Sequence, residues 1–127
     1  MKTPQDILAQ WLNAVNNKDL PSLLGLYDNK AVLVPTFSNE LLNTTDKIRK
    51  YFETLGTYEE LTVTLNEKSL IVQELENQVF SLSGFYNWSF IVDGKLLNFE
   101  ARFTYLITPS KPNPIIHHHS SETPKQN

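Results

Sequence analysis

The order of two hydrophobic periodicities predicts an α+β fold for this chain, with helices packed on one face of an antiparallel sheet. Up to about residue 56, most apolar residues recur at the three-to-four-residue spacing of amphipathic helices. From residue 58 onward they alternate with polar residues, as along half-buried strands. Helices followed by a run of strands are typical of α+β proteins rather than of repeating βαβ units.

Three helices are expected in the first half of the chain. The first follows Asp6, which can cap its N-terminus, and the second follows Asp19. The third follows Thr44 or Thr45 and is stopped by Gly56. Their apolar stripes consist of Ile7, Leu8, Trp11, Leu12 and Val15, then Leu23, Leu24 and Tyr27, then Ile48, Tyr51, Phe52 and Leu55.

Six strands are expected, over residues 31–34, 61–65, 70–75, 80–92, 95–105 and 115–119. Asp28-Asn29, before the first of them, predicts a turn. Asp93-Gly94 predicts a two-residue hairpin between the two longest strands, which alternate most clearly. A proline-rich loop precedes the last strand.

The Asp93-Gly94 turn also predicts the register of the hairpin. It places Trp88 opposite Phe99 and Tyr86 opposite Ala101, so that the aromatic residues of both strands share one face of the sheet. The other face carries mostly polar residues, namely Asn87, Ser89, Glu100, Arg102 and Thr104. If the helices left the aromatic face uncovered, it would suit a dimer interface.

The composition is that of an ordinary globular domain. The 127 residues predict a single domain, over residues 1–120, followed by a polar tail over residues 121–127. The net charge of −3 argues against nucleic acid and anionic membranes as partners. The sequence has neither a signal peptide nor a membrane-spanning run, and it contains no cysteine, so we expect a cytoplasmic protein without disulfides or thiolate chemistry.

Four segments carry a resemblance to a known family. Residues 27–39 resemble the early strand of bacterial SnoaL-like proteins, most closely those related to the association (hub) domain of calcium/calmodulin-dependent protein kinase II. Residues 49–53 resemble the third-helix motif of that group, and residues 100–105 its penultimate strand. Residues 115–124 resemble its closing strand, in which a histidine-rich stretch runs into a serine and a proline.

This resemblance implies a cone-shaped, nuclear transport factor 2-like fold, with three N-terminal helices packed on a curved antiparallel sheet. It further implies a homodimer or higher oligomer, joined through the outer face of the sheet, and a pocket between the helices and the concave face. No kinase domain is present, so the resemblance does not imply control by calmodulin.

The resemblance also suggests ligand-binding residues. Arg102 matches an arginine of the hub pocket, whereas Ser120 stands where the hub domain has another arginine and His118 where it has a phenylalanine-like residue. Glu100 lies beside Arg102, and Tyr51 lies on the inner face of the third helix, where it could donate a hydrogen bond. The alternative for Arg102 and Glu100 is a structural ion pair, and for Tyr51 a place in the core.

The histidine run offers little support for a metal site. On a strand, His117 and His119 face one way and His118 the other, so only two imidazoles can converge. Structural zinc sites need four ligands and catalytic sites usually three, and no nearby acidic residue has a suitable spacing. We therefore expect no metal and no cofactor, and we expect His118 and Ser120 to face the pocket.

Three hypotheses about function remain open. The first is a homo-oligomeric association-type domain that binds a small polar or anionic organic ligand in its cone. The second is a small cofactor-independent enzyme of the polyketide cyclase or ketosteroid isomerase type, with Glu100 or His118 as general base. The third is a purely structural assembly module. No nucleophile, phosphate-loop or dinucleotide motif specifies a reaction.

Overall fold

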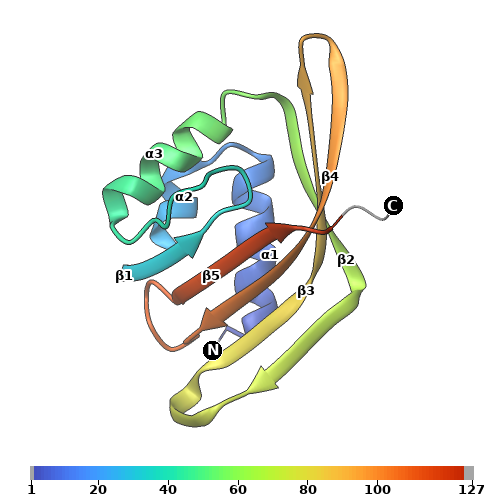
Figure 1. Cartoon of the computed structure of the whole chain (residues 1–127). Coiled ribbons are helices and arrows are strands. Elements are labelled where there is room, and N and C mark those ends of the chain that lie inside the picture. Colours follow the sequence, from blue (N-terminus) through green and yellow to red (C-terminus); the bar gives the residue numbers. More distant parts are fainter. Residues whose placement is uncertain (1, 125–127) are drawn as a thin grey trace.

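A computed structural model describes residues 2–124 of the chain. Its helices lie on one side of a single curved sheet, as expected (Figure 1). In chain order the elements are α1 (Pro4–Asn16), α2 (Leu20–Gly25), β1 (Tyr27–Val34), α3 (Thr45–Leu55), β2 (Glu59–Glu74), a short 3-10 helix (Glu76–Gln78), β3 (Phe80–Val92), β4 (Lys95–Ile107) and β5 (Ile115–Glu122). No helix in this described part is long and apolar enough to span a bilayer.

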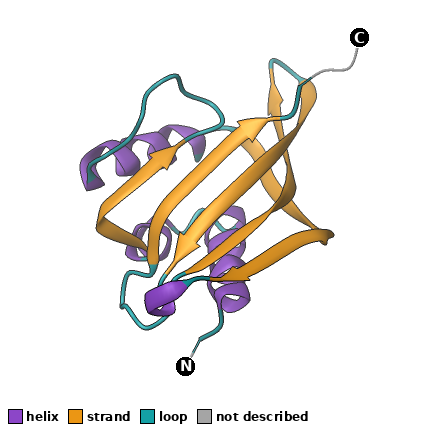
Figure 2. Cartoon of the chain, turned by 60° about the horizontal axis from the view of Figure 1, so that its bottom comes forward, coloured by secondary structure: helices purple, strands orange, loops and turns teal. Residues whose placement is uncertain are grey.

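The five strands lie in the order β1-β5-β4-β3-β2, and the sheet curves around α1 (Figure 2). All neighbouring strands are antiparallel except β1 and β5, which run parallel. The sheet is therefore mixed, and the expectation of a wholly antiparallel sheet was wrong at this edge. The last strand, β5, lies between β1 and β4, parallel to β1 and antiparallel to β4.

The helix starts follow local capping chemistry. Thr3, not Asp6, is the N-cap of α1: its hydroxyl accepts from the Asp6 N–H, and the Asp6 carboxylate accepts from the Thr3 N–H. This reciprocal pair is a capping box, in which the acidic residue stands three positions after the cap. Asp19 and Thr44 cap α2 and α3, as the sequence predicts.

Three strand boundaries differ from the prediction. Asp28-Asn29 lies inside β1, where the Asp28 carboxylate accepts from the Lys30 N–H in an irregular stretch of the strand. The expected strands over 61–65 and 70–75 are one strand, β2, interrupted by a bulge between Asn66 and Ile71. β5 continues to Glu122, which lies inside the predicted tail; residues 125–127 of that tail lie outside the described residues.

The predicted hairpin register is confirmed, with Trp88 opposite Phe99 and Tyr86 opposite Ala101. Asp93 and Gly94 both have positive φ, as a two-residue turn of this kind requires. The aromatic face, however, is the one that the helices cover, and its central residues are buried. The idea of an uncovered aromatic face was therefore wrong, because burying these rings against α1 removes the largest apolar surface from water.

Candidate functional site

His118 lies at the centre of the space between the helices and the sheet. It sits on β5 with its side chain on the concave face and is only 2% exposed. The ring of Tyr105 stacks on its imidazole, with centroids 3.9 Å apart, and Trp11 of α1 packs edge-on against it at 5.4 Å. Ser120, two residues further along β5, is also buried on this face, so both side chains point towards the helices.

A chain of hydrogen bonds runs through the imidazole. The Trp11 indole N–H donates to the Tyr27 hydroxyl at 2.9 Å, and that hydroxyl lies 2.9 Å from His118 Nδ1. On the other side, His118 Nε2 lies 3.2 Å from the Tyr86 hydroxyl, which donates to Ser120 Oγ at 2.6 Å. Ser120 Oγ in turn bonds the hydroxyl of Thr36, which is only partly buried.

The direction of these hydrogen bonds determines the tautomer of His118. Because the Tyr86 hydroxyl gives its only proton to Ser120, it must accept from His118, so the proton of the neutral ring is on Nε2. Nδ1 then accepts from Tyr27, whose oxygen is free to accept from Trp11. Every polar atom of the imidazole is satisfied in the neutral form.

The electrostatics also favour the neutral form. Burial lowers the pKa of His118 well below its usual value, and the charges of His117 and His119 act in the same direction. Burial likewise raises the pKa of Tyr27, Tyr86 and Tyr105 above that of an exposed tyrosine. At neutral pH the centre of the cone is therefore uncharged.

Two buried polar atoms beside these hydrogen bonds have no partner among residues 2–124. They are the indole nitrogen of Trp88 and the hydroxyl of Tyr105. The Trp88 ring packs edge-on against Tyr86, with ring centroids 5.5 Å apart, and the Tyr105 ring stacks on His118. Such orphaned groups cost free energy, so the polar cluster is only partly satisfied.

Two hollows open beside α3, and neither is lined by His118. The first, of about 360 Å³, is lined by Tyr51, Phe37 and Tyr58, with Lys47 and Lys50 among its polar residues. The Tyr51 hydroxyl accepts from the Phe37 N–H at 3.4 Å, and the Phe37 ring packs on Trp88 at 5.5 Å. Tyr51 thus faces an open hollow, whereas aromatic rings separate that hollow from the polar cluster.

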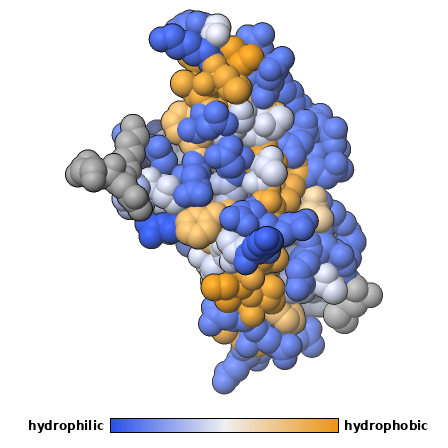
Figure 3. All heavy atoms as spheres, turned by 90° about the vertical axis from the view of Figure 1, so that its right-hand side faces the viewer, coloured by the Kyte–Doolittle hydropathy of each residue, from blue (hydrophilic) through white to orange (hydrophobic). Residues whose placement is uncertain are grey.

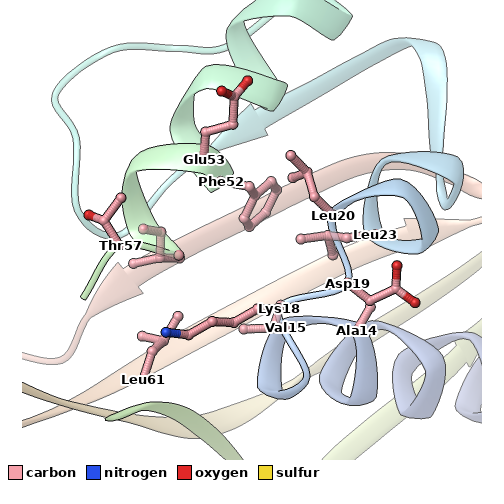
Figure 4. A pocket seen from close by; sticks show the side chains of 12 residues that line it. Ala14, Val15, Lys18, Asp19, Leu20, Leu23, Phe52, Glu53, Thr57 and Leu61 are labelled. Carbon is pink, nitrogen blue, oxygen red and sulfur yellow. The ribbon is translucent and has the colours of Figure 1, made fainter. Parts of the chain in front are cut away.

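The second hollow, of about 330 Å³, lies between α1, α2 and α3 (Figure 4). Phe52 points into it from α3, and Lys18 extends along it from the end of α1. The Phe52 ring also packs against Tyr27 at 5.9 Å, which closes this side of the cone as well. His118 is therefore enclosed on both sides by aromatic side chains.

The structure separates Arg102 and Glu100 from the other three predicted site residues. Both are exposed on the outer face of β4, the face away from the helices. Arg102 stands opposite Phe85 on β3 and Ser121 on β5, and Glu100 stands opposite Asn87. Arg102 and Glu100 therefore cannot line one cavity with His118, Ser120 and Tyr51. The resemblance matches Arg102 to a pocket arginine, but in this sheet Arg102 lies on the face away from the helices.

The enzyme hypothesis used Glu100 or His118 as the general base. Glu100 faces outward and His118 is enclosed, so neither is adjacent to the hollow at Tyr51. Within residues 2–124, no group of three or more histidine, aspartate, glutamate or cysteine side chains is placed to hold a metal ion.

Sequence reasoning missed the tyrosines of the polar cluster. The sequence pattern predicts Tyr27 on a helix stripe and Tyr86 and Tyr105 on strands, because a tyrosine in a hydrophobic pattern is typical of a core position. A sequence signal for these tyrosines exists. A buried imidazole needs a hydrogen-bond partner at each of its two nitrogens, and tyrosine hydroxyls are candidates to supply them.

The helices and curved sheet define the cone-shaped class that includes nuclear transport factor 2-like and cystatin-like proteins. A structure from Xanthomonas campestris, described as a proposed calcium/calmodulin dependent protein kinase II association domain, is 26% identical over 98% of this chain and 91% of its own, with a TM-score of 0.82. The CaMKII hub of S. rosetta is 14% identical over 97% of this chain and 99% of its own, with a TM-score of 0.79.

A proposed dehydratase of the NTF2-like family from Streptomyces avermitilis has the same fold at 12% identity, over 94% of this chain and 93% of its own, with a TM-score of 0.79. No curated protein matches the chain. The model of the calcium/calmodulin dependent protein kinase II association domain family matches residues 5–124. The chain belongs to this family.

Proposed function

We propose that this protein is a self-associating domain whose copies meet through the outer face of the sheet. The observation that carries the proposal is the charge pattern of that face. Arg102 and Glu100 are adjacent outward positions of β4, both are exposed, and neither forms an ion pair within the described residues. An opposite-charge pair of this kind is self-complementary, because a two-fold axis can place Arg102 of each copy against Glu100 of the other.

Apolar surface on the same side of the molecule supports the proposal. Seen from this side, apolar atoms gather towards both ends and hydrophilic atoms lie between them (Figure 3). Leu96 near the hairpin and Ile71 on β2 are 59% and 62% exposed, and both lie at outward positions of the sheet. Apolar surface around a charged pair is what a second copy would bury. Membership in a family named for association is consistent with this function.

A charge-reversal series tests the proposal. By sedimentation equilibrium we expect Arg102→Glu or Glu100→Arg to weaken self-association at least about tenfold, because each change places like charges across the axis. The double variant, Arg102→Glu with Glu100→Arg, should restore association to near the wild-type value. Lys50→Glu, the same change of charge on the helical side, is the control and should have no effect. A monomer at millimolar concentration, or a double variant no better than the single ones, would contradict the proposal.

A second candidate function is the binding of a small anionic organic molecule in the hollow at Tyr51. The aromatic walls supplied by Tyr51, Phe37 and Tyr58 suit an organic body, and Lys47 and Lys50 supply positive charge beside them. Its volume of about 360 Å³ lies within the range of small-molecule sites.

Native mass spectrometry of untagged, gently purified protein tests this second function. It reports the number of subunits and any retained small molecule together. Extra mass that is present in the wild type and lost in a variant carrying Lys47→Ala and Lys50→Ala would support an anion site. Extra mass that persists in that variant would place the ligand elsewhere. A hollow that stays empty, in an intact oligomer, would favour a purely structural assembly module.

A further inference from the structure

The hollow between α1, α2 and α3 has an apolar floor. Ala14 and Val15 of α1, Leu23 of α2, and Phe52 and Leu55 of α3 line it, and all five are buried in the core. Its volume of about 330 Å³ lies within the range of small-molecule sites. The hollow therefore suits the apolar body of a small organic molecule.

The charged side chains in the lining of this hollow are Lys18, Asp19 and Glu53. The Asp19 carboxylate accepts from the Ser22 N–H at the start of α2, and the Glu53 carboxylate lies 3.4 Å from Arg49 Nε. Lys18 extends along the hollow, with its nitrogen well away from both carboxylates (Figure 4). Among residues 2–124 it forms no ion pair. The hollow therefore carries one positive charge that no acidic side chain offsets.

The ammonium group of Lys18 is held in place and still has donors to offer. It donates to the Tyr58 carbonyl, in the segment between α3 and β2, at 3.3 Å. An ammonium group has three N–H donors, so two remain for a bound molecule. A carboxylate matches them, because its oxygens accept charge-assisted hydrogen bonds from a cation.

The backbone conformation of Lys18 is unusual for a lysine. α1 ends in a Schellman motif, in which the Lys18 N–H bonds the Val15 carbonyl and the Asp19 N–H bonds the Ala14 carbonyl. Lys18 occupies the left-handed position of this motif, with φ of 54°, where glycine is the usual residue. A lysine there costs free energy that a glycine would not. Residues in such conformations cluster at binding sites, which supports a role for this side chain in the hollow.

We infer that the hollow between α1, α2 and α3 binds a small monocarboxylate with an apolar body, whose carboxylate pairs with Lys18. The body lies against the buried side chains of the three helices, and the carboxylate lies beside the exposed ammonium group, where water also reaches it. This site is separate from the hollow at Tyr51, because the two linings share only Leu55. It does not depend on the proposed self-association.

Titration calorimetry with octanoate tests the inference, with 1-octanol and octylammonium as probes that keep the apolar body and change the head group. We expect octanoate to bind at least about fivefold more tightly than octanol, because only the carboxylate pairs with the ammonium group. Octylammonium should bind no more tightly than octanol. Lys18→Gln removes the charge and should lower the affinity for octanoate to that for octanol. Lys30→Gln, the same change on β1 and outside the lining, is the matched control and should bind octanoate like the wild type.

Lys18→Gly separates binding from stability. Glycine adopts the left-handed conformation without steric cost, so the Tm should rise while the affinity for octanoate falls as in Lys18→Gln. A Tm below that of the wild type would mean that the lysine serves stability, and would overturn the inference.

Three other results would also overturn the site. The first is octanoate that does not bind at millimolar concentration, or that binds Lys18→Gln as tightly as the wild type. The second is equal affinity for octanoate and octanol, which would show an apolar groove without a carboxylate site. The third is binding that persists in Lys18→Gln and is lost in the variant carrying Lys47→Ala and Lys50→Ala, which would place octanoate in the hollow at Tyr51. Each of these results leaves the proposed self-association standing, because none of the measurements reports on the oligomer.

Discussion

At the scale of single residues, the neutral state of His118 makes stability depend on pH. The pKa of His118 in the folded protein lies well below its value of about 6.5 in the unfolded chain, so below pH 6.5 the unfolded state binds more protons. This contribution to stability is complete above pH 6.5 and is lost as the pH falls. The free energy of unfolding should decrease by about 1.4 kcal/mol between pH 7.5 and 5.5 from this residue alone.

Urea unfolding of the wild type and of His118→Gln at the two pH values measures this effect. The glutamine cannot titrate, so its variant should lose most of the pH dependence, although it will be less stable throughout. His117→Gln is the matched control, because His117 is only partly buried, and should keep most of the dependence. Equal pH dependence in wild type and His118→Gln would show that His118 is not the titrating group.

Two buried tyrosines in the same cluster should respond in opposite ways to loss of the hydroxyl. Tyr27→Phe leaves both the Trp11 indole and His118 Nδ1 without a partner and should cost about 2–4 kcal/mol of unfolding free energy. Tyr105→Phe removes a hydroxyl that already lacks a partner, so stability should stay unchanged or rise by about 1 kcal/mol. Denaturant unfolding at pH 7.5 compares the two. A large loss in Tyr105→Phe would mean that its hydroxyl is satisfied in solution.

At the scale of elements, the bulge in β2 depends on one side chain. Ser69 Oγ accepts from the Phe85 N–H at 2.8 Å and donates to the Asn66 carbonyl at 2.7 Å, which replaces ladder bonds that the bulge interrupts. Ser69→Ala should cost about 1–2 kcal/mol and speed hydrogen exchange of the Phe85 amide. Ser38→Ala, whose hydroxyl accepts from an N–H in a surface loop, is the control, with less than about 0.5 kcal/mol expected. Unchanged exchange at Phe85 would contradict this account.

Elements set by local residues could be predicted from the sequence, whereas elements set by contacts between distant segments could not. The hairpin was predictable to the residue, because Asp93-Gly94 is a local signal that fixes both turn and register. The sequence predicts two separate strands on either side of residues 66–69, because local patterns do not show that Ser69 bonds a neighbouring strand. The parallel contact of β1 with β5 joins the two ends of the fold and has no local signal at all.

At the scale of the whole molecule, the site was less predictable than the fold. Strand alternation predicts that His118 and Ser120 share one face of β5, and both are buried on the same face. Which face of β4 the helices would cover did not follow, because alternation gives two faces without saying which is inside. The resemblance suggests a pocket role for Arg102 and its neighbour Glu100, whereas both lie on the outer surface of the sheet. Within residues 2–124 the polar cluster around His118 is neutral, whereas the charged pair Arg102 and Glu100 lies on the outer face of the sheet.

Self-association through that surface should make thermal stability depend on protein concentration. If copies associate only when folded, a tenfold rise in concentration stabilises a dimer by about 1.4 kcal/mol, or about 0.7 kcal/mol per chain. For a domain of 127 residues this corresponds to a rise in Tm of about 2–3 °C. Differential scanning calorimetry from 10 μM to 1 mM should show this slope in the wild type and a shallower one in Arg102→Glu. A Tm independent of concentration, in a protein that sediments as an oligomer, would contradict this prediction, because it would mean that unfolding does not separate the copies.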